Sequence, residues 1–287
     1  MAVAATMTFP DRLAAEVERK RSQLVVGLDP RPDLLPVELR GDVARFCCGI
    51  IDAVAPHAVA VKPQLAFFEA IGTAGIAAFE QVCVYARRAG LIVIADGKRG
   101  DIGSTARAYA EAYLEGSPPR ADALTVNPWL GRESVEPYLA AARRHGVGIF
   151  VVVKTSNAGA DIQDVTLSDG RPMWHQVAAA VAEWGADLVG DVGLSSVGAV
   201  VGATHPRAVA DARRLMPQAV FLLPGVGAQG ASVAELTRAF QSGPASALVT
   251  ASRSVIYAYR DTGADFREAA GAEAARLQSE IWAASGW

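Results

Sequence analysis

The sequence predicts a single α/β domain, residues 1–287, with the fold of a (β/α)8 TIM barrel. Three observations favour this fold. The length of 287 residues is normal for such a barrel. Eight short β-rich runs recur along the chain, and helical patterns lie between them. Strands that alternate with helices imply a parallel sheet, and eight such units favour closure into a barrel over the alternative, a doubly wound sheet.

The predicted elements follow one another in a regular order. The strands cover residues 23–29, 58–64, 91–98, 123–128, 148–156, 197–204, 219–227 and 247–254. The helices between them cover residues 38–54, 75–89, 104–115, 134–145, 175–185, 206–216 and 232–240, and an amphipathic helix over 265–287 closes the barrel. The polar, Gly- and Asp-rich segment 157–173 is expected to be a long loop after the fifth strand, not a linker between domains.

The amino-terminal segment has no basic stretch followed by an apolar one, so it does not resemble a signal peptide. We expect a flexible tail over residues 1–9 and an amphipathic helix from about Pro10 to Arg21. No apolar run reaches transmembrane length. The composition, with 51% hydrophobic and 20% charged residues and a net charge of −3, is that of a globular protein and indicates neither a nucleic-acid nor a membrane partner.

The chain has an odd number of cysteines, and none of them shows a CxxC spacing: they are Cys47, Cys48 and Cys83. They are interpreted as reduced core residues, which favours a cytoplasmic location. The four histidines are scattered and show no spacing typical of metal ligands, so no metal and no other cofactor is predicted.

The third strand ends in an unusual group of charges. The run LIVIA leads into Asp96, Lys98, Arg99 and Asp101. Because strand side chains alternate between two faces, Asp96 and Lys98 share the face of the apolar residues before them. If that face is the barrel interior, both lie at its top, whereas Arg99 points away and is expected to be a solvated loop charge.

Neighbouring strands deliver further charges to the same region. By the same alternation, the second strand ends in Lys62 and the first in Asp29, while Asp101 follows just beyond the third. Active sites of (β/α)8 barrels lie at the carboxyl ends of the strands. A structural ion-pair network that caps the barrel is the alternative. Because burying such a network adds little net stability, a catalytic task explains the cluster better.

The seventh strand leads into PGVGAQGAS, residues 224–232, whose glycines fit GxGxxG. A dinucleotide site would need an acidic residue at the end of the next strand, but that strand ends in Ser252 and Arg253. Loops after strands seven and eight commonly bind phosphate in barrels, and arginine binds phosphate oxygens in pairs. The pattern therefore predicts a site for one phosphate monoester; a simple tight turn is the alternative.

These motifs together resemble the orotidine 5′-phosphate decarboxylase family. DGKRGDIGSTA is similar to the family signature DxKxxDI, and VGLDP, AVKPQ, PGVGAQG and the arginine of strand eight follow in the family's order. The resemblance spans about Gln23 to Tyr259, and NPWLG after the fourth strand is similar to the longer bacterial branch. It implies conversion of orotidine 5′-phosphate to UMP and CO2, a step of de novo pyrimidine biosynthesis.

The resemblance also implies roles for single residues. Lys98 would donate a proton to C6 of the pyrimidine, Asp96 would face the substrate carboxylate, and Lys62 and Asp29 would hold the ribose. Asp101, Ile102 and Thr105 would reach across a homodimer into the partner's site. The catalytic set is Lys98, Asp96, Lys62 and Asp101. The substrate-binding set is Asp29, Ile102, Thr105, Asn127, Pro224, Gly227, Gln229, Ser252 and Arg253, of which Asn127 would contact the pyrimidine, Gln229 would bridge phosphate and base, and Arg253 would bind the phosphate. Segments 157–173 and 228–234 are candidate lids.

Three other functions fit part of the pattern. A Mg²⁺-dependent sugar-phosphate decarboxylase or aldolase can share DxKxxD, but it would need an acid where this chain has Lys62. A Schiff-base aldolase could use Lys154, at the end of the fifth strand. A non-catalytic phosphate-binding barrel would leave the burial of Asp96 and Lys98 without a purpose.

Overall fold

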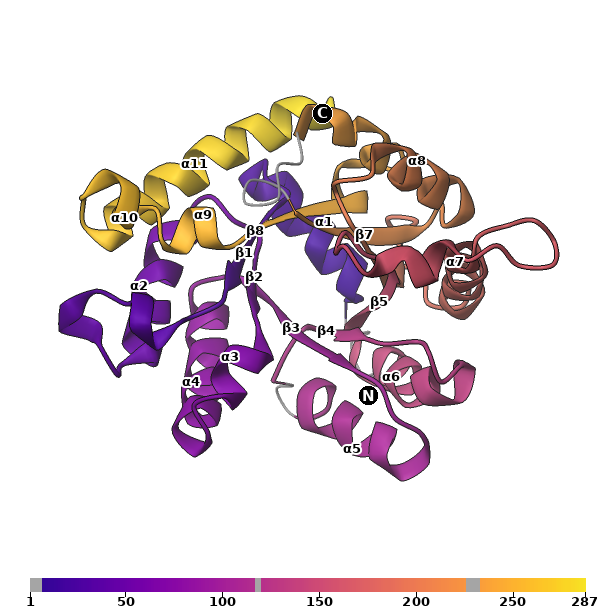
Figure 1. Cartoon of the computed structure of the whole chain (residues 1–287), viewed down its shortest axis with the longest axis horizontal. Coiled ribbons are helices and arrows are strands. Elements are labelled where there is room, and N and C mark those ends of the chain that lie inside the picture. Colours follow the sequence, from indigo (N-terminus) through magenta and orange to yellow (C-terminus); the bar gives the residue numbers. More distant parts are fainter. Residues whose placement is uncertain (1–6, 117–119, 226–232) are drawn as a thin grey trace, which may run out of the picture.

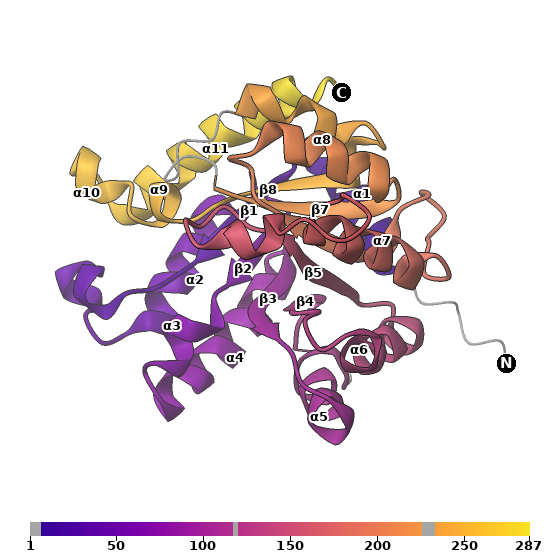
Figure 2. The same cartoon turned by 45° about the vertical axis from the view of Figure 1, so that its right-hand side comes forward.

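The computed structural model describes residues 7–116, 120–225 and 233–287. Eight parallel strands close into a barrel in chain order, and helices surround it (Figures 1 and 2). The strands are β1 Leu24–Leu28, β2 Ala60–Pro63, β3 Ile92–Arg99, β4 Ala123–Val126, β5 Gly148–Lys154, β6 Ser195–Val201, β7 Ala219–Pro224 and β8 Ala247–Ala251. The predicted barrel is confirmed, and each strand lies within the range that the sequence predicts, apart from the ends of β3 and β6.

The larger helices are α1 Phe9–Lys20, α2 Val43–Val54, α4 Thr73–Arg88, α5 Gly103–Leu114, α6 Arg132–His145, α7 Met173–Gly185, α8 Pro206–Leu215 and α11 Phe266–Ser285. Short helices that the sequence does not predict are α3 Leu65–Glu69, α9 Arg253–Ile256 and α10 Tyr259–Thr262. The 3-10 segments are η1 Pro32–Leu34, η2 Val37–Leu39, η3 Ala160–Asp164, η4 Val233–Phe240 and η5 Pro244–Ser246. No helix in the described ranges is long and apolar enough to cross a membrane.

Two predicted helices differ from the structure. The helix expected over 38–54 begins only at Val43, because the Asp42 carboxylate accepts a hydrogen bond from the Arg45 amide and caps the helix there. The segment expected to be helical over 232–240 forms η4, a 3-10 helix. The predicted loop 157–173 contains η3 and an isolated bridge between Thr166 and Pro172.

Two apolar layers build the core. One lies between the strands and the outer helices, and the other fills the barrel interior. The interior layer continues into α1, whose Phe9, Leu13 and Val17 are buried against it and close the floor of the barrel. Phe9, placed by the sequence in the flexible tail, is the first residue of this helix. A Cβ at Gly148 would lie 2.5 Å from the Phe9 ring, so glycine is needed where α1 meets β5.

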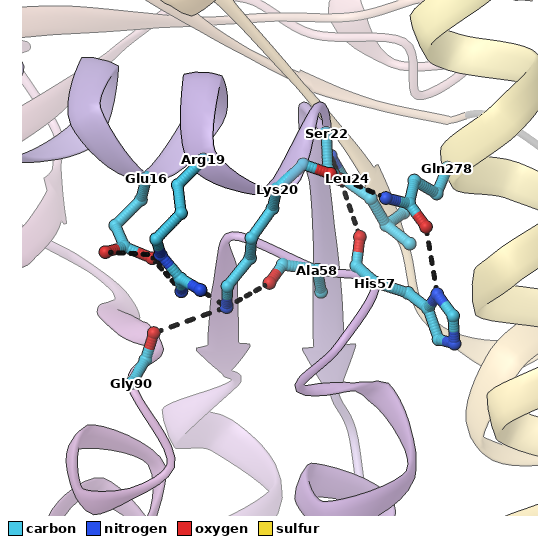
Figure 3. A network of polar contacts seen from close by, with 9 residues as sticks. All are labelled: Glu16, Arg19, Lys20, Ser22, Leu24, His57, Ala58, Gly90 and Gln278. Carbon is cyan, nitrogen blue, oxygen red and sulfur yellow. Dashed lines mark hydrogen bonds and ion pairs between the residues drawn. The ribbon is translucent and has the colours of Figure 1, made fainter.

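A polar network joins α1 to the floor and to α11 (Figure 3). The Lys20 ammonium donates to the carbonyls of Ala58, at 2.8 Å, and Gly90, at 3.3 Å. Gln278 donates to the Lys20 carbonyl at 2.7 Å, and its Oε1 lies 2.9 Å from His57 Nδ1. The network fixes the end of α1 at the end of the barrel where the strands begin.

A buried arginine closes the base of β7 and β8. The Arg213 guanidinium donates to the carbonyls of Ala239, Ser246, Ala219, Met216 and Pro217 at 2.7–3.3 Å. It also lies over the Phe221 ring, 3.7 Å from the centroid. Burial lowers the pKa of Arg213 to about 9. Because five carbonyls surround the charge, the starts of both strands are held to α8 and η4.

The cysteines are free. Cys47 and Cys83 are buried, as predicted, whereas Cys48 is only half-buried on α2 and is not a core residue.

Candidate active site

Asp96 is the centre of a charged cluster at the end of β3. Its Oδ2 accepts from Lys62 Nζ, at 2.5 Å, and its Oδ1 accepts from Lys98 Nζ, at 2.6 Å. Asp96 is 4% exposed and Lys62 7%, whereas the Lys98 side chain is 45% exposed. The two lysines therefore bind opposite oxygens of one buried carboxylate, and Lys98 is the one that reaches solvent. The predicted meeting of these three residues is confirmed.

The backbone of β3 bends to achieve this arrangement. The register with β4 shifts between Ala95 and Arg99, and Lys98 adopts φ = 44°, a left-handed conformation that costs free energy for a side chain with a Cβ. A Cβ at Gly97 would lie 2.6 Å from the Leu65 side chain, so the glycine of DGK allows β3 to pass close to α3. Strain of this kind is often retained where a side chain has a task.

The charges decide the ionisation of the cluster. Burial by itself would raise the pKa of the Asp96 carboxyl, but the charges of Lys62 and Lys98 and their hydrogen bonds outweigh it. They hold the pKa of Asp96 well below its usual range. Asp96 is thus a carboxylate throughout the neutral pH range.

Arg99 points away from this cluster, as predicted, but it is not a solvated loop charge. Its guanidinium binds the carboxylate of Glu69 and lies 3.4 Å from the Tyr113 hydroxyl. It is also 5.4 Å from the centroid of the Tyr109 ring. The partner acid lies on α3, a helix that the sequence does not predict, so the ion pair could not be foreseen.

Asp29 follows β1 at the same end of the barrel. Its carbonyl accepts from the Tyr257 hydroxyl at 3.0 Å. Its side-chain Oδ1 is buried and has no hydrogen-bond partner among the described residues. A buried carboxylate oxygen without a partner is uncommon in proteins, so Asp29 can accept hydrogen bonds from a ligand there.

The ends of β7 and β8 carry the predicted phosphate residues. Ser252 donates to the Gly27 carbonyl at 3.2 Å, and a Cβ at Gly27 would lie 2.7 Å from Ser252, so β1 and β8 approach closely. Pro224 pairs with Thr250 at the end of β7. Arg253 is exposed, and its guanidinium makes no hydrogen bond to any residue that the structure describes. Gly227 and Gln229 lie outside the described residues.

Asp101, Ile102 and Thr105 do not join the cluster within one chain. The Asp101 carboxylate accepts from the Ile102 amide at 2.8 Å, immediately before α5. The Ile102 side chain is 51% exposed, and Thr105 is exposed on the first turn of that helix. These residues therefore present polar and apolar groups outward, beside the catalytic end of β3.

The chain is similar to known proteins over most of its length. Residues 22–269 match the model of the orotidine 5′-phosphate decarboxylase / HUMPS family. The chain belongs to this family. It is 48% identical to orotidine 5′-phosphate decarboxylase of Deinococcus radiodurans, over 92% of this chain and 95% of that protein. The enzyme of that name from Rhodopirellula baltica is 45% identical, over 88% and 90% of the two chains.

The fold agrees with solved structures of the family. Leishmania donovani OMP decarboxylase matches with a TM-score of 0.77 and 33% identity, over 98% of this chain and 100% of that one. A crystal structure of a proposed orotidine 5′-phosphate decarboxylase from Streptomyces avermitilis matches with a TM-score of 0.84 and 37% identity, over 100% and 99%.

Two polar residues of this family member were not assigned a role from the sequence. Thr125 of β4 is 1% exposed; its hydroxyl donates to Asp96 Oδ1 and accepts from the Lys98 amide, both at 2.9 Å. Gln64 donates to Asp96 Oδ2 at 3.0 Å. Strand alternation places Thr125 on the same face as Asn127, at the end of β4, and this was the signal in the sequence that could have found it.

Asn127 itself lies away from the charged cluster. Its Oδ1 accepts from the Trp129 amide at 3.0 Å. It borders a cavity of about 490 Å³ between the loops that follow β4 and β5. Asn127 thus borders this pocket and, within the part of the chain that the structure describes, makes no hydrogen bond to Asp96 or Lys98.

Proposed function

We propose that the protein converts orotidine 5′-phosphate to UMP and CO2 without a metal or organic cofactor, in the cytoplasm. The observation that carries the proposal is the position of Lys98, whose ammonium lies 2.6 Å from the buried Asp96 carboxylate and remains partly exposed. An ammonium held in this way is fixed in position before substrate arrives.

The reaction needs little else from the protein. When the bond from C6 to the carboxylate breaks, its electron pair stays on C6, where no ring system can accept it. The Lys98 ammonium stabilises this charge and then transfers a proton to C6. Asp96 faces the departing carboxylate, and Lys62 keeps Asp96 ionised. The products are UMP, CO2 and a neutral Lys98 amine, which solvent reprotonates.

The other predicted residues bind the rest of the substrate. Asp29, with its unpartnered oxygen, accepts from ribose hydroxyls. Arg253, exposed at the end of β8, binds the phosphate together with Ser252, Gly227 and Gln229. Binding of the remote phosphate lowers the chemical barrier by ordering the site.

The exposed side chains of Ile102 and Thr105, with the half-buried Asp101 beside them, support a homodimer in which each chain completes the partner's site. In the proposed dimer these three residues reach the substrate of the other chain.

The first test follows the ultraviolet absorbance of orotidine 5′-phosphate in the presence of EDTA. We expect wild type to reduce the absorbance, Lys98→Ala to leave it unchanged, and Arg40→Ala, which removes a charge from an exposed loop, to behave as wild type. No change with folded wild type would refute the decarboxylase. Turnover that requires Mg²⁺ and a sugar phosphate would favour the metal-dependent alternative.

A further inference from the structure

The loop between β5 and α7 is fastened to the strand end by a buried charge. Lys154, the last residue of β5, is 5% exposed, and its ammonium donates to Asp164 Oδ2 at 2.7 Å. Asp164 is the last residue of η3, and its side chain is 56% exposed. Without Asp164 the Lys154 charge would stay buried with no carboxylate beside it, which is costly.

The neighbouring residues form a second attachment. The Thr155 amide donates to Gln163 Oε1 at 2.9 Å, and Gln163 Nε2 donates back to the Thr155 hydroxyl at 2.9 Å. Two successive residues at the strand end thus bind two successive residues of η3. We refer to Lys154, Thr155, Gln163 and Asp164 as the clasp.

The clasp holds one wall of the cavity beside Asn127. The η3 residues Ile162 and Gln163 line that cavity, as do Trp129 of the facing loop and Trp174 of α7. Its volume of about 490 Å³ is within the range typical of small-molecule sites.

Polar contacts matter here because the loop has few apolar anchors. The side chains of Ile162 and Val165 are 53% and 50% exposed. A segment with little buried apolar area opens easily unless other contacts hold it. The clasp therefore decides whether this wall is fixed or moves.

We propose that Gln163 and Asp164 are positioning residues that hold the β5–α7 loop as a fixed wall for the pyrimidine end of the substrate. The proposal rests on the proposed function for the identity of that substrate. It gives Lys154 a docking role in place of the Schiff-base role considered from the sequence.

The test compares Asp164→Ala with Asp161→Ala. Both variants remove an aspartate from η3, but Asp161 is exposed and has no hydrogen bond to the described residues. In Asp164→Ala we expect hydrogen exchange of the Thr155 amide and thermolysin cleavage near Ile162 to accelerate about tenfold, because a charge-assisted contact is lost.

The kinetic constants separate positioning from a purely structural role. For Asp164→Ala, KM for orotidine 5′-phosphate should rise about fivefold while kcat changes less than about twofold, since the wall binds substrate but does not touch C6. Asp164→Glu should recover most of the loss, and Asp161→Ala should match wild type. The melting temperature should fall in Asp164→Ala, because the buried Lys154 charge loses its carboxylate, and should stay close to that of wild type in Asp164→Glu and Asp161→Ala.

Two results would overturn the proposal. In the first, Asp164→Ala and Asp161→Ala have the same rate of hydrogen exchange and the same KM. In the second, hydrogen exchange is faster in Asp164→Ala but its KM equals that of wild type. Hydrogen exchange and proteolysis need no substrate, so they test the clasp independently. An error in the proposed function would instead be seen as absent turnover by wild type.

Discussion

Thr125 contacts both ends of the Asp96–Lys98 pair through a single oxygen atom. It donates to the carboxylate of Asp96 and accepts from the main chain of Lys98, where the backbone is strained. The hydroxyl therefore sets the direction of the carboxylate and supports the bend that aims the ammonium. Thr125 is a positioning residue for the proposed reaction.

Replacing Thr125 by valine keeps the shape of the side chain and removes this oxygen. We expect kcat to fall about 10- to 100-fold, corresponding to the loss of one buried hydrogen-bonding group. KM should change less than about threefold, because Thr125 does not reach the solvent-facing part of the site. Steady-state kinetics would test this, with Thr125→Ser as the control that retains the hydroxyl and most of the activity. Equal loss in both variants would show that the methyl packing matters, not the hydroxyl.

The sequence predicts the position of a side chain well where strand alternation fixes it. It predicts the contacts of a side chain poorly where the partner lies far away in the sequence. Lys62, Asp96 and Lys98 meet because strand faces alternate and neighbouring strands end together. Thr125 is an ordinary strand former, so its polar role depends on what lies opposite it. Alternation directs Arg99 away from Asp96 and Lys98, but it does not reveal the ion pair with Glu69, a residue that lies 30 positions earlier in the chain.

At the scale of elements, the floor network makes stability depend on pH. Burial lowers the pKa of Lys20 to about 8, although the nearby carboxylate of Glu16 opposes this. The unfolded chain, with an ordinary lysine pKa near 10.5, binds more protons between these values. Stability contributed by this group therefore rises as pH increases from about 8 to 10.5.

Lys20→Met isolates that contribution. Other groups titrate in the same range, so the measured quantity is the difference in free energy of unfolding between wild type and Lys20→Met. We expect this difference to shift in favour of wild type as pH rises from 8 to 10, as determined by urea unfolding. A difference that stays constant with pH would contradict the lowered pKa.

Helices are predicted less accurately than strands in this chain. The start of α2 depends on the cap at Asp42, which a continuous helical pattern over 38–54 obscures. The segment 233–240 has helical spacing of apolar residues but winds as a 3-10 helix. Arg213 binds the carbonyl of Ala239 near its end, a tertiary contact that local sequence does not reveal.

At the scale of the whole molecule, the barrel could be predicted because every strand is followed by a turn and a helical pattern. Closure required only the count of strands and the chain length. The dimer could not be predicted from the strand pattern, because the exposed Ile102 and the half-buried Asp101 would meet their partners only in another chain.

Mixing two inactive variants tests the shared site. Lys98→Ala and Asp101→Asn each lose activity in a homodimer, but a mixed dimer has one intact site and one with both changes. After subunit exchange, we expect about one quarter of wild-type activity, because about half of the dimers are mixed and each has one working site. If the sites were not shared, the mixture would stay as inactive as its components.

The closed floor of the barrel has a practical consequence for attaching this protein to a surface or to a second enzyme. Phe9 and the rest of α1 seal the floor, and Trp287 at the carboxyl end lies with Ala14 and Glu18 of α1 around one cavity. The end of the chain is therefore on the side opposite Lys98. A tether to a surface or a second enzyme, attached after Trp287, would leave the mouth of the barrel facing outward and open to substrate.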